Sequence, residues 1–281
     1  MALVRECFVD PFSVEAVHAM KQCIRAIRAW MQADKLKLNE NKTEVMLIGN
    51  GQQLSKVNLG TLTVGDTSVA IVNKARNLGV WFDSQLNFNV HITKICSLSF
   101  CSLYKIRRIR KYLSYESAQT LILALVIGRL DYCNSLLYGL PASYIIKLQR
   151  VQNAAARLIS NTTRFDHISP VMKDLHWLPV EYRIMFKLVV YTFKALHGSA
   201  PTYIHQLIRP KPPSNYNLRS NTKHLLLDLP NKTKKTTGDR AFFAAAPTLW
   251  NALPDELRAL GSLKTFMARL KTHYFKLAFS L

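Results

Sequence analysis

Acidic side chains are scarce in this chain, and their distribution is uneven. The 281 residues hold 38 Lys and Arg but 17 Asp and Glu, so the formal net charge is +21 and the pI is near 10.0. Residues 61–281 carry 30 of the basic and 11 of the acidic side chains. So large an excess indicates a polyanionic partner, and nucleic acid fits it better than a membrane surface does. We expect the binding residues to lie mostly downstream of residue 60.

Cysteine pairs and long apolar runs are also lacking. The five cysteines form no C-x-x-C pair, so no zinc site is legible, and an odd number of thiols without a secretory leader predicts reduced cysteines inside a cell. The longest apolar run, "LILALVIG" at 121–128, is far shorter than the roughly 20 residues that span a bilayer. We therefore predict an intracellular protein of the cytoplasm or nucleus with no membrane partner.

The hydrophobic pattern changes its period near Asp83. Before it, an amphipathic helix from Ser13 to Met31 precedes strand-like stretches, "TEVMLIG", "LTVGDTSVAIV" and "RNLGVWFD", and Gly65-Asp66 has the composition of a hairpin turn. After it, a period of about 3.6 predicts helices near 87–112, 115–138, 142–160, 181–197 and 262–277. The predicted fold class is therefore α+β, with a short mixed segment followed by a mainly helical bundle.

Composition divides the chain into five predicted segments. These are an α+β segment at 1–83, a helical domain at 84–162, a helical region at 163–208, a basic loop or linker at 209–240, and a packing segment with a final helix at 241–281. The 209–240 segment holds eight basic and two acidic residues, with Tyr216 as its one aromatic. It could contact single-stranded nucleic acid or serve as a solvated linker.

Basic residues concentrate between residues 91 and 160, where ten face two acidic ones. In "YKIRRIRKY", at 104–112, five cations occupy about two helical turns, and three more on the next predicted helix share a face. A solvated helix face is the alternative interpretation, although such faces usually mix both signs of charge. We predict that the following side chains bind nucleic-acid phosphates: Lys105, Arg107, Arg108, Arg110, Lys111, Lys147, Arg150 and Arg157.

Several stretches, in the same order along the chain, resemble the C-terminal part of reverse transcriptases from non-LTR (LINE-type) retrotransposons. They are "WMQADKLKLNENKTEVMLIG", "NLGVWFDSQLNFNVHI", "IRKYLS", "GRLDYCNSLLYGLP", "LQRVQNAAARLI", "HISPVMKDLHWLPVEYRI", "GDRAFFAAAPTLWNALP" and "LKTHYF". The resemblance covers nearly the whole chain. It implies that residues 1–83 are the end of a palm, that residues 84–162 are a thumb, and that a family-specific C-terminal region follows.

The resemblance also implies roles for three residues of the first segment. Leu78 and Gly79, in "NLGV", would belong to a primer-grip strand that contacts nucleic acid. Lys42 would be the relic of a catalytic lysine near the incoming nucleotide. From the residues alone, Lys42 is better described as a solvated lysine in a turn rich in asparagine, and only the resemblance favours the relic.

The carboxylates that polymerisation requires are not legible in this sequence. Two metal ions must be held by converging acidic side chains, and the family places an adjacent aspartate pair where this chain reads "MALVRECFVDPFS". The adjacent acids Asp255 and Glu256 follow a proline, which predicts the start of a helix. We expect no metal site, no cofactor and no catalysis from this chain alone, whereas the resemblance implies Mg²⁺ for the intact parent enzyme.

The expected function is therefore that of a truncated RNA-directed DNA polymerase. It would bind a primer–template duplex of RNA or DNA through its basic helices without extending it, and would take no small-molecule substrate. Two alternatives stay open. The chain could be a non-catalytic interaction or structural protein derived from the same element, or an unstable pseudogene-like product, because an incomplete sheet leaves unpaired strand edges.

The residue types of a thiol triad are also present, without a recognisable nucleophile turn. They are Cys133, Asn134, His167 and His176. The two histidines lack the spacing of a zinc-binding helix. We predict that Cys133 is a buried structural residue.

Overall fold

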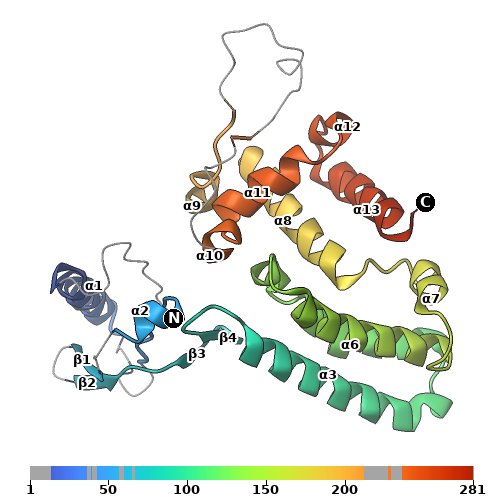
Figure 1. The fold of residues 1–281 in the computed structure, drawn as a ribbon, viewed down its shortest axis with the longest axis horizontal. Coiled ribbons are helices and arrows are strands. Elements are labelled where there is room, and N and C mark those ends of the chain that lie inside the picture. Colours follow the sequence, from blue (N-terminus) through green and yellow to red (C-terminus); the bar gives the residue numbers. More distant parts are fainter. Residues whose placement is uncertain are drawn as a thin grey trace, which may run out of the picture. The chain divides into compact units, whose positions relative to one another are not determined.

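The computed structural model describes residues 14–36, 39, 43–56, 60–64, 67–211, 227–228 and 236–280. The chain divides into two compact units, residues 1–91 and 92–281. The described residues form an α+β fold that is mostly helical, with two small antiparallel sheets of two strands each (Figure 1). The predicted class is confirmed at this level, whereas the palm and thumb assignments and the five predicted segments stay predictions.

The first unit combines two helices with two hairpins. Its elements are α1 (Val14–Ala33), α2 (Gly51–Leu54), β1 (Thr61–Val64), β2 (Thr67–Ala70), β3 (Lys74–Asn77) and β4 (Val80–Asp83). Met20 and Ile24 on the apolar face of α1 pack against the buried Val69 of β2, together with Val45. This contact explains the spacing of apolar residues along α1, because side chains four apart lie on one face of a helix.

The predicted strand "TEVMLIG" is wrong as a strand of a sheet. Val45 forms an isolated parallel bridge with Ile71, and residues 46–50 belong to no strand. The predicted hairpin across Gly65-Asp66 is confirmed by the antiparallel pairing of β1 with β2, although the two turn residues lie outside the described part.

The stretch "RNLGVWFD" is a hairpin, not a single strand. Strand β3 pairs with β4 from Lys74 opposite Asp83 to Asn77 opposite Val80. Leu78 and Gly79 form the two-residue turn with φ of 46° and 88°, the left-handed conformation that such tight turns need. The carboxylate of Asp83 then accepts hydrogen bonds from the backbone N–H groups of the residues that follow, at 2.7 Å for the nearest.

Helices make up the second unit, beginning with the greater part of α3. The elements in order are α3 (Asn89–Ile109), η2 (Arg110–Tyr112), α4 (Tyr115–Ile122), η3 (Leu123–Ile127), α5 (Gly128–Asp131), η4 (Asn134–Leu137), α6 (Ala142–Ser160), α7 (Ile168–Asp174), α8 (Val180–Leu196), α9 (Thr202–His205), α10 (Thr236–Asp239), α11 (Phe242–Asn251), α12 (Asp255–Arg258) and α13 (Leu263–Phe279). In the described part of this unit, no helix is long and apolar enough to cross a membrane.

Local signals set the ends of several helices. The Ser114 side chain accepts a hydrogen bond from the Ser117 backbone N–H at 3.2 Å and caps α4. Pro141 precedes α6, and Asn161 ends it with a left-handed φ of 55°. Asp255 and Glu256 lie in the first turn of α12, as predicted.

The single helix predicted at 115–138 is wrong. The chain changes to a π-helical turn at η3 and breaks at Cys133, which has a left-handed φ of 53°. Cys133 is half-buried rather than buried. Its neighbour Asn134 is buried, with its amide within 3.5 Å of the Asp131 carboxylate.

Polar side chains from well-separated parts of the sequence hold the second unit together. Arg183 on α8 makes a bidentate ion pair with the carboxylate of Asp131 on α5. The buried Gln152 side chain of α6 donates to the Leu178 carbonyl at 2.9 Å. Because these polar groups would be costly to bury unpaired, the stretches that carry the resemblance also carry cross-links of the fold.

A second core lies towards the C-terminus, where α11 and α13 both pack on α8 (Figure 1). Trp250 and Phe266 are fully buried there, and the rings of Phe266 and Phe193 stack with their centroids 4.3 Å apart. We call this cluster, with the ring of Trp250 5.8 Å from that of Phe266, the aromatic core. Such stacked rings contribute more than their buried area alone.

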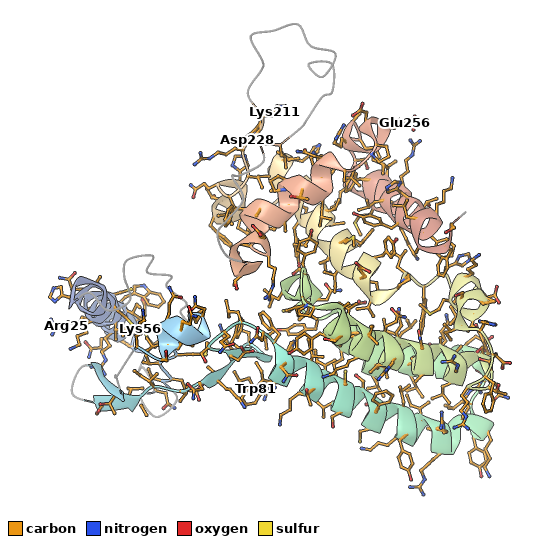
Figure 2. All side chains as sticks on the ribbon, viewed as in Figure 1. Arg25, Lys56, Trp81, Lys211, Asp228 and Glu256 are labelled. Carbon is orange, nitrogen blue, oxygen red and sulfur yellow. The ribbon has the colours of Figure 1, made fainter. Side chains whose placement is uncertain are left out.

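Part of the predicted 209–240 loop belongs to this core. Leu227 is 1% exposed, and its backbone exchanges two hydrogen bonds with the Asn251 side chain, at 2.8 and 2.9 Å. Pro210 forms an antiparallel bridge with Leu227, and the Asp228 backbone N–H donates to the Arg209 carbonyl at 2.8 Å. Lys211 and Asp228 therefore lie close together (Figure 2). Residues 212–226 and 229–235, with Tyr216, lie outside the described residues.

Candidate nucleic-acid interface

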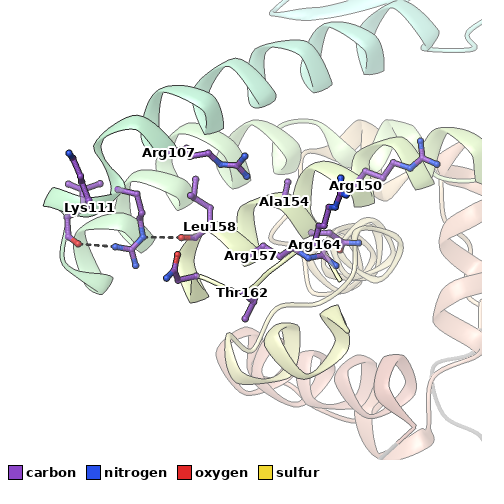
Figure 3. Close-up of a pocket in the computed structure, with 12 residues that line it drawn as sticks. Arg107, Lys111, Arg150, Ala154, Arg157, Leu158, Thr162 and Arg164 are labelled. Atoms are coloured by element: carbon purple, nitrogen blue, oxygen red, sulfur yellow. Dashed lines mark hydrogen bonds between the residues drawn. The ribbon is translucent and has the colours of Figure 1, made fainter. Parts of the chain in front are cut away.

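An open hollow of about 800 Å³ lies where η2 meets the C-terminal half of α6 (Figure 3). Its lining residues are Arg107, Arg110, Lys111, Leu113, Arg150, Asn153, Ala154, Arg157, Leu158, Asn161, Thr162 and Arg164. Six of these side chains are cationic, and none of the lining residues is acidic in the described part of the chain. We call this feature the basic hollow. So many like charges on one concave surface favour an anionic ligand.

Arg110 builds the hollow rather than facing a ligand. Its guanidinium donates to the carbonyl oxygens of Leu158 and Ile159, both at 3.0 Å, and to that of Leu113 at 3.0 Å. The hydrogen bond to Leu158 is drawn in Figure 3. The first two carbonyls belong to the last turn of α6, where backbone acceptors lack helical partners and the helix dipole is negative. Arg110 therefore joins the end of α3 to the end of α6.

Arg157 has a similar structural role on the other side. It donates to the carbonyl oxygens of Thr163 at 3.1 Å and Asp166 at 3.2 Å. The Asp166 carboxylate accepts from the Thr163 backbone N–H at 2.7 Å and from its hydroxyl at 2.9 Å. These hydrogen bonds from Thr163 hold the pKa of the Asp166 carboxyl below its ordinary value. The turn at 163–166 is thus tied to α6 and internally cross-linked.

Four cations of the hollow remain available to a ligand. The structure describes no hydrogen bond or ion pair for the charged groups of these residues, which are all exposed: Arg107, Lys111, Arg150 and Arg164. Figure 3 shows Arg107, Arg150 and Arg164 among the sticks that line the space. Arginine forks and lysine ammonium groups are the common protein ligands of phosphate oxygens.

Two of these four cations each lie over an aromatic ring. The Lys111 ammonium is 4.8 Å from the centroid of Tyr112, and the Arg164 guanidinium carbon is 4.7 Å from the centroid of Phe165. Both rings are strongly exposed, at 77% and 81%. Cation–π contacts at such distances restrict a long side chain while leaving its charge accessible.

The remaining predicted binding residues do not line the hollow. Lys105 and Arg108 lie on the outer face of α3, because the buried residues Leu103 and Ile106 mark the inner face. Lys147 lies on α6 with its ammonium 5.3 Å from the Tyr144 ring. Lys105 and Arg108 therefore point away from the hollow, whereas Lys147 shares the face of Arg150 and Arg157 but lies nearer to the start of α6.

The predicted residues of the first segment have other positions. Leu78 and Gly79 form the tip of the β3–β4 hairpin in the first unit, and Leu78 is 75% exposed. Lys42 lies outside the described residues. Their predicted contacts with nucleic acid stay predictions.

Arg164 is a lining residue that the sequence analysis missed. It follows Asn161, the residue whose left-handed conformation ends α6, so the chain turns back and returns Arg164 to the same end of the helix that carries Arg157. The end of the helix predicted at 142–160 gave the place of the turn. The direction of the chain after it depends on the hydrogen bond from Arg157 to the Asp166 carbonyl, which the sequence does not reveal.

The other candidate residues are held in separate structural contacts. The His176 ring packs 5.9 Å from that of Phe275, whereas Asn134 pairs with Asp131 beside Cys133. Within the described ranges, no group of three or more His, Cys, Asp or Glu side chains is placed to hold a metal ion. The basic hollow is therefore the site whose geometry supports a function best.

Comparisons with known proteins supply no family for this chain. No protein-family model matches it, and no curated protein and no solved structure shows a significant similarity.

Proposed function

We propose that the chain is a nucleic-acid-binding part of a non-LTR-type reverse transcriptase and that the basic hollow grips the phosphate backbone of a primer–template duplex. The observation that carries the proposal is that the six cations of the hollow fall into two groups with different hydrogen bonding. Two are fixed on backbone carbonyls and shape the surface, and four have charges that point to no protein acceptor in the described residues. A surface built in this way fits an anion that the protein itself does not supply.

The kind of ligand follows from the chemistry of the hollow. Several separate cations across an open surface suit a chain of phosphates better than one small anion, which would be enclosed. Phosphate contacts fix the position of a duplex without reading its sequence. We therefore expect RNA–DNA hybrid and duplex DNA to bind with little sequence preference.

The resemblance to non-LTR reverse transcriptases indicates what such a grip would serve. In a reverse transcriptase, this grip would hold the duplex while a palm performs the chemistry. The chain's own contribution is binding, and the catalytic carboxylates with their Mg²⁺ would belong to the parent enzyme. A structural or interaction role for a chain that kept the fold is the second candidate. It is favoured by the hydrogen bonds of Arg183 and Gln152, because these join the stretches that resemble the family to one another and serve the fold rather than a ligand.

The test is binding of the purified chain to two labelled RNA–DNA hybrids of unrelated sequence, followed by fluorescence anisotropy. Four phosphate contacts predict a log–log salt slope near −3.6, which corresponds to about a 10²-fold loss of affinity between roughly 50 and 200 mM salt. Equal affinity for the two sequences is expected. Binding that ignores salt, or that follows one sequence, would reject the phosphate grip and favour the second candidate.

A matched pair of charge reversals on α6 localises the binding. Arg150 lines the hollow and Lys147 does not, although both are exposed and three residues apart. Arg150→Glu should remove one contact and add repulsion, so affinity at low salt falls strongly. Lys147→Glu makes the same change in net charge but removes no contact of the hollow, so its loss of affinity should be clearly smaller. Equal losses for the two variants would show that the hollow is not the binding site.

A further inference from the structure

Two aromatic rings contact cations that line the basic hollow, and the proposed phosphate grip does not need them. Tyr112 ends η2, next to Lys111, and Phe165 follows Arg164 in the turn after α6. They are 77% and 81% exposed. They are the most exposed of the described aromatic side chains, and Tyr203 and Tyr104 follow at 67% and 64%. Covering an exposed ring with a ligand recovers the free energy of burying it, so the two rings are available for a contact that the phosphate grip does not make.

Phe165 is presented on a fixed turn. Its backbone N–H donates to the Thr163 hydroxyl at 3.3 Å, the Asp166 carboxylate closes the turn on Thr163, and Arg157 ties both ends of the turn to α6. A ring on such a turn loses little backbone freedom when a ligand binds, which raises affinity.

Tyr112 is fixed in a comparable way from the other side. It is the last residue of the turn η2, whose first residue, Arg110, is bonded to the carbonyl oxygens of Leu158 and Ile159. Each ring also neighbours a cation that lines the hollow, at 4.8 Å for Lys111 and 4.7 Å for Arg164. A phosphate on the cation would therefore bring the attached nucleotide within reach of the ring.

We propose that Tyr112 and Phe165 stack unpaired bases, so that the basic hollow takes nucleic acid with a single-stranded segment in preference to a blunt duplex. This inference rests on the proposed function, because the cations must hold the backbone first. The faces of paired bases are covered by their neighbours in a duplex, whereas unpaired bases offer a π-face to any ring. Stacking does not depend on base identity, which agrees with a grip that ignores sequence.

The test compares three labelled probes on the intact chain: a non-self-complementary single strand of about 20 nucleotides, a blunt duplex of that length, and the duplex with a single-stranded extension. Phe165→Ala should weaken binding of the single strand and the extended duplex about tenfold and leave the blunt duplex unchanged. Phe165→Trp should retain affinity, because a larger ring stacks at least as well. Phe165→Ala with Tyr112→Ala should cost about 10²-fold.

Controls separate stacking from loss of structure. Tyr203 is also exposed, at 67%, but unlike Tyr112 and Phe165 it is not next to a cation that lines the hollow, so Tyr203→Ala should bind all three probes like the wild type. Each variant is first checked for an unchanged thermal melt. An equal loss on blunt and single-stranded probes would overturn the inference, because the ring would then only orient Arg164.

The failure of the inference can be told apart from failure of the proposed function. If the wild type binds blunt duplex with the expected salt slope and Phe165→Ala changes no probe, stacking is wrong and the phosphate grip stands. If the wild type binds none of the probes in a salt-dependent manner, the grip is wrong and the inference falls with it.

Discussion

The basic hollow and the aromatic core belong to the same unit, but they are built by opposite means. The aromatic core excludes water and is held by stacked rings, with Phe193, Trp250 and Phe266 at its centre. The basic hollow is open and is shaped by two arginines, Arg110 and Arg157, that satisfy backbone carbonyls. The contrast teaches that folding and binding depend on different side chains here. Substitutions should therefore separate the two properties.

The largest expected effect is on the stability of the aromatic core. Phe266→Ala removes a fully buried ring that contacts two others, so the free energy of unfolding should fall by about 3–5 kcal/mol. Thermal and urea melts measure this loss. Met267 is the exposed neighbour on the same helix, and Met267→Ala should stay within about 0.5 kcal/mol of the wild type. A cost for Phe266→Ala no larger than that of the control would show that this cluster is not the core of the unit.

A smaller effect should distinguish the two kinds of arginine in the hollow. Arg110→Ala leaves carbonyls at the end of α6 without their donor and should cost about 1–3 kcal/mol of stability. Arg107→Ala removes the same charge but no protein hydrogen bond that the structure describes, so the melt should be unchanged and the salt slope should flatten by about 0.9. Equal melts for the two variants would contradict the structural role of Arg110.

Arg110→Lys sharpens the same comparison. Lysine keeps the charge, but its ammonium cannot reproduce the planar fork that reaches Leu158 and Ile159 together. Most of the loss of stability should therefore remain in this variant. Full recovery with lysine would mean that charge alone matters at this position.

The smallest expected effect is on the pH dependence of thermal stability, through Asp166 in the turn that carries Phe165. The folded pKa of Asp166 is depressed by its hydrogen bonds from Thr163, so its contribution to stability is complete above the unfolded pKa and is lost as the pH falls through the folded one. Asp166→Asn should melt slightly below the wild type near pH 6, and the gap should close as the pH falls through the folded pKa, which lies below the ordinary value of about 3.9. A gap that does not change with pH would contradict an ionised Asp166 in the turn.

Sequence reasoning succeeded where the signal was local. Helix periodicity placed α6 at its observed bounds, and the acids after a proline marked the start of α12 at Asp255, because both signals depend on neighbouring residues. It failed at Cys133, where a left-handed residue breaks the helix predicted at 115–138, and at Leu227, in the short apolar run "LLLDL" of a segment predicted to be a loop, which enters the core. Both depend on contacts with distant residues, which periodicity does not report.

The sequence predicted that cations form the candidate site, but not which of them bind a ligand and which hold the fold. The cluster of cations around residue 107 is visible in the sequence, whereas the assignment of Arg110 to the end of α6, 48 residues away, is not. For the same reason, the sequence did not separate Lys105, Arg108 and Lys147 from the residues of the hollow. The direction of a side chain around α3 and its position along α6 become informative only once the packing of the rest of the chain is known.

The salt dependence of two triple variants tests the central claim most directly. Arg107, Arg150 and Arg164 line the hollow, whereas Lys105, Arg108 and Lys147 do not; changing either set to alanine removes three positive charges. On an RNA–DNA hybrid, the variant of the hollow should flatten the log–log slope by about 2.7, and the control by less than about 0.9. Both variants should melt like the wild type. Equal flattening by the two variants would show that the chain binds through its overall charge and would contradict a phosphate grip at the basic hollow.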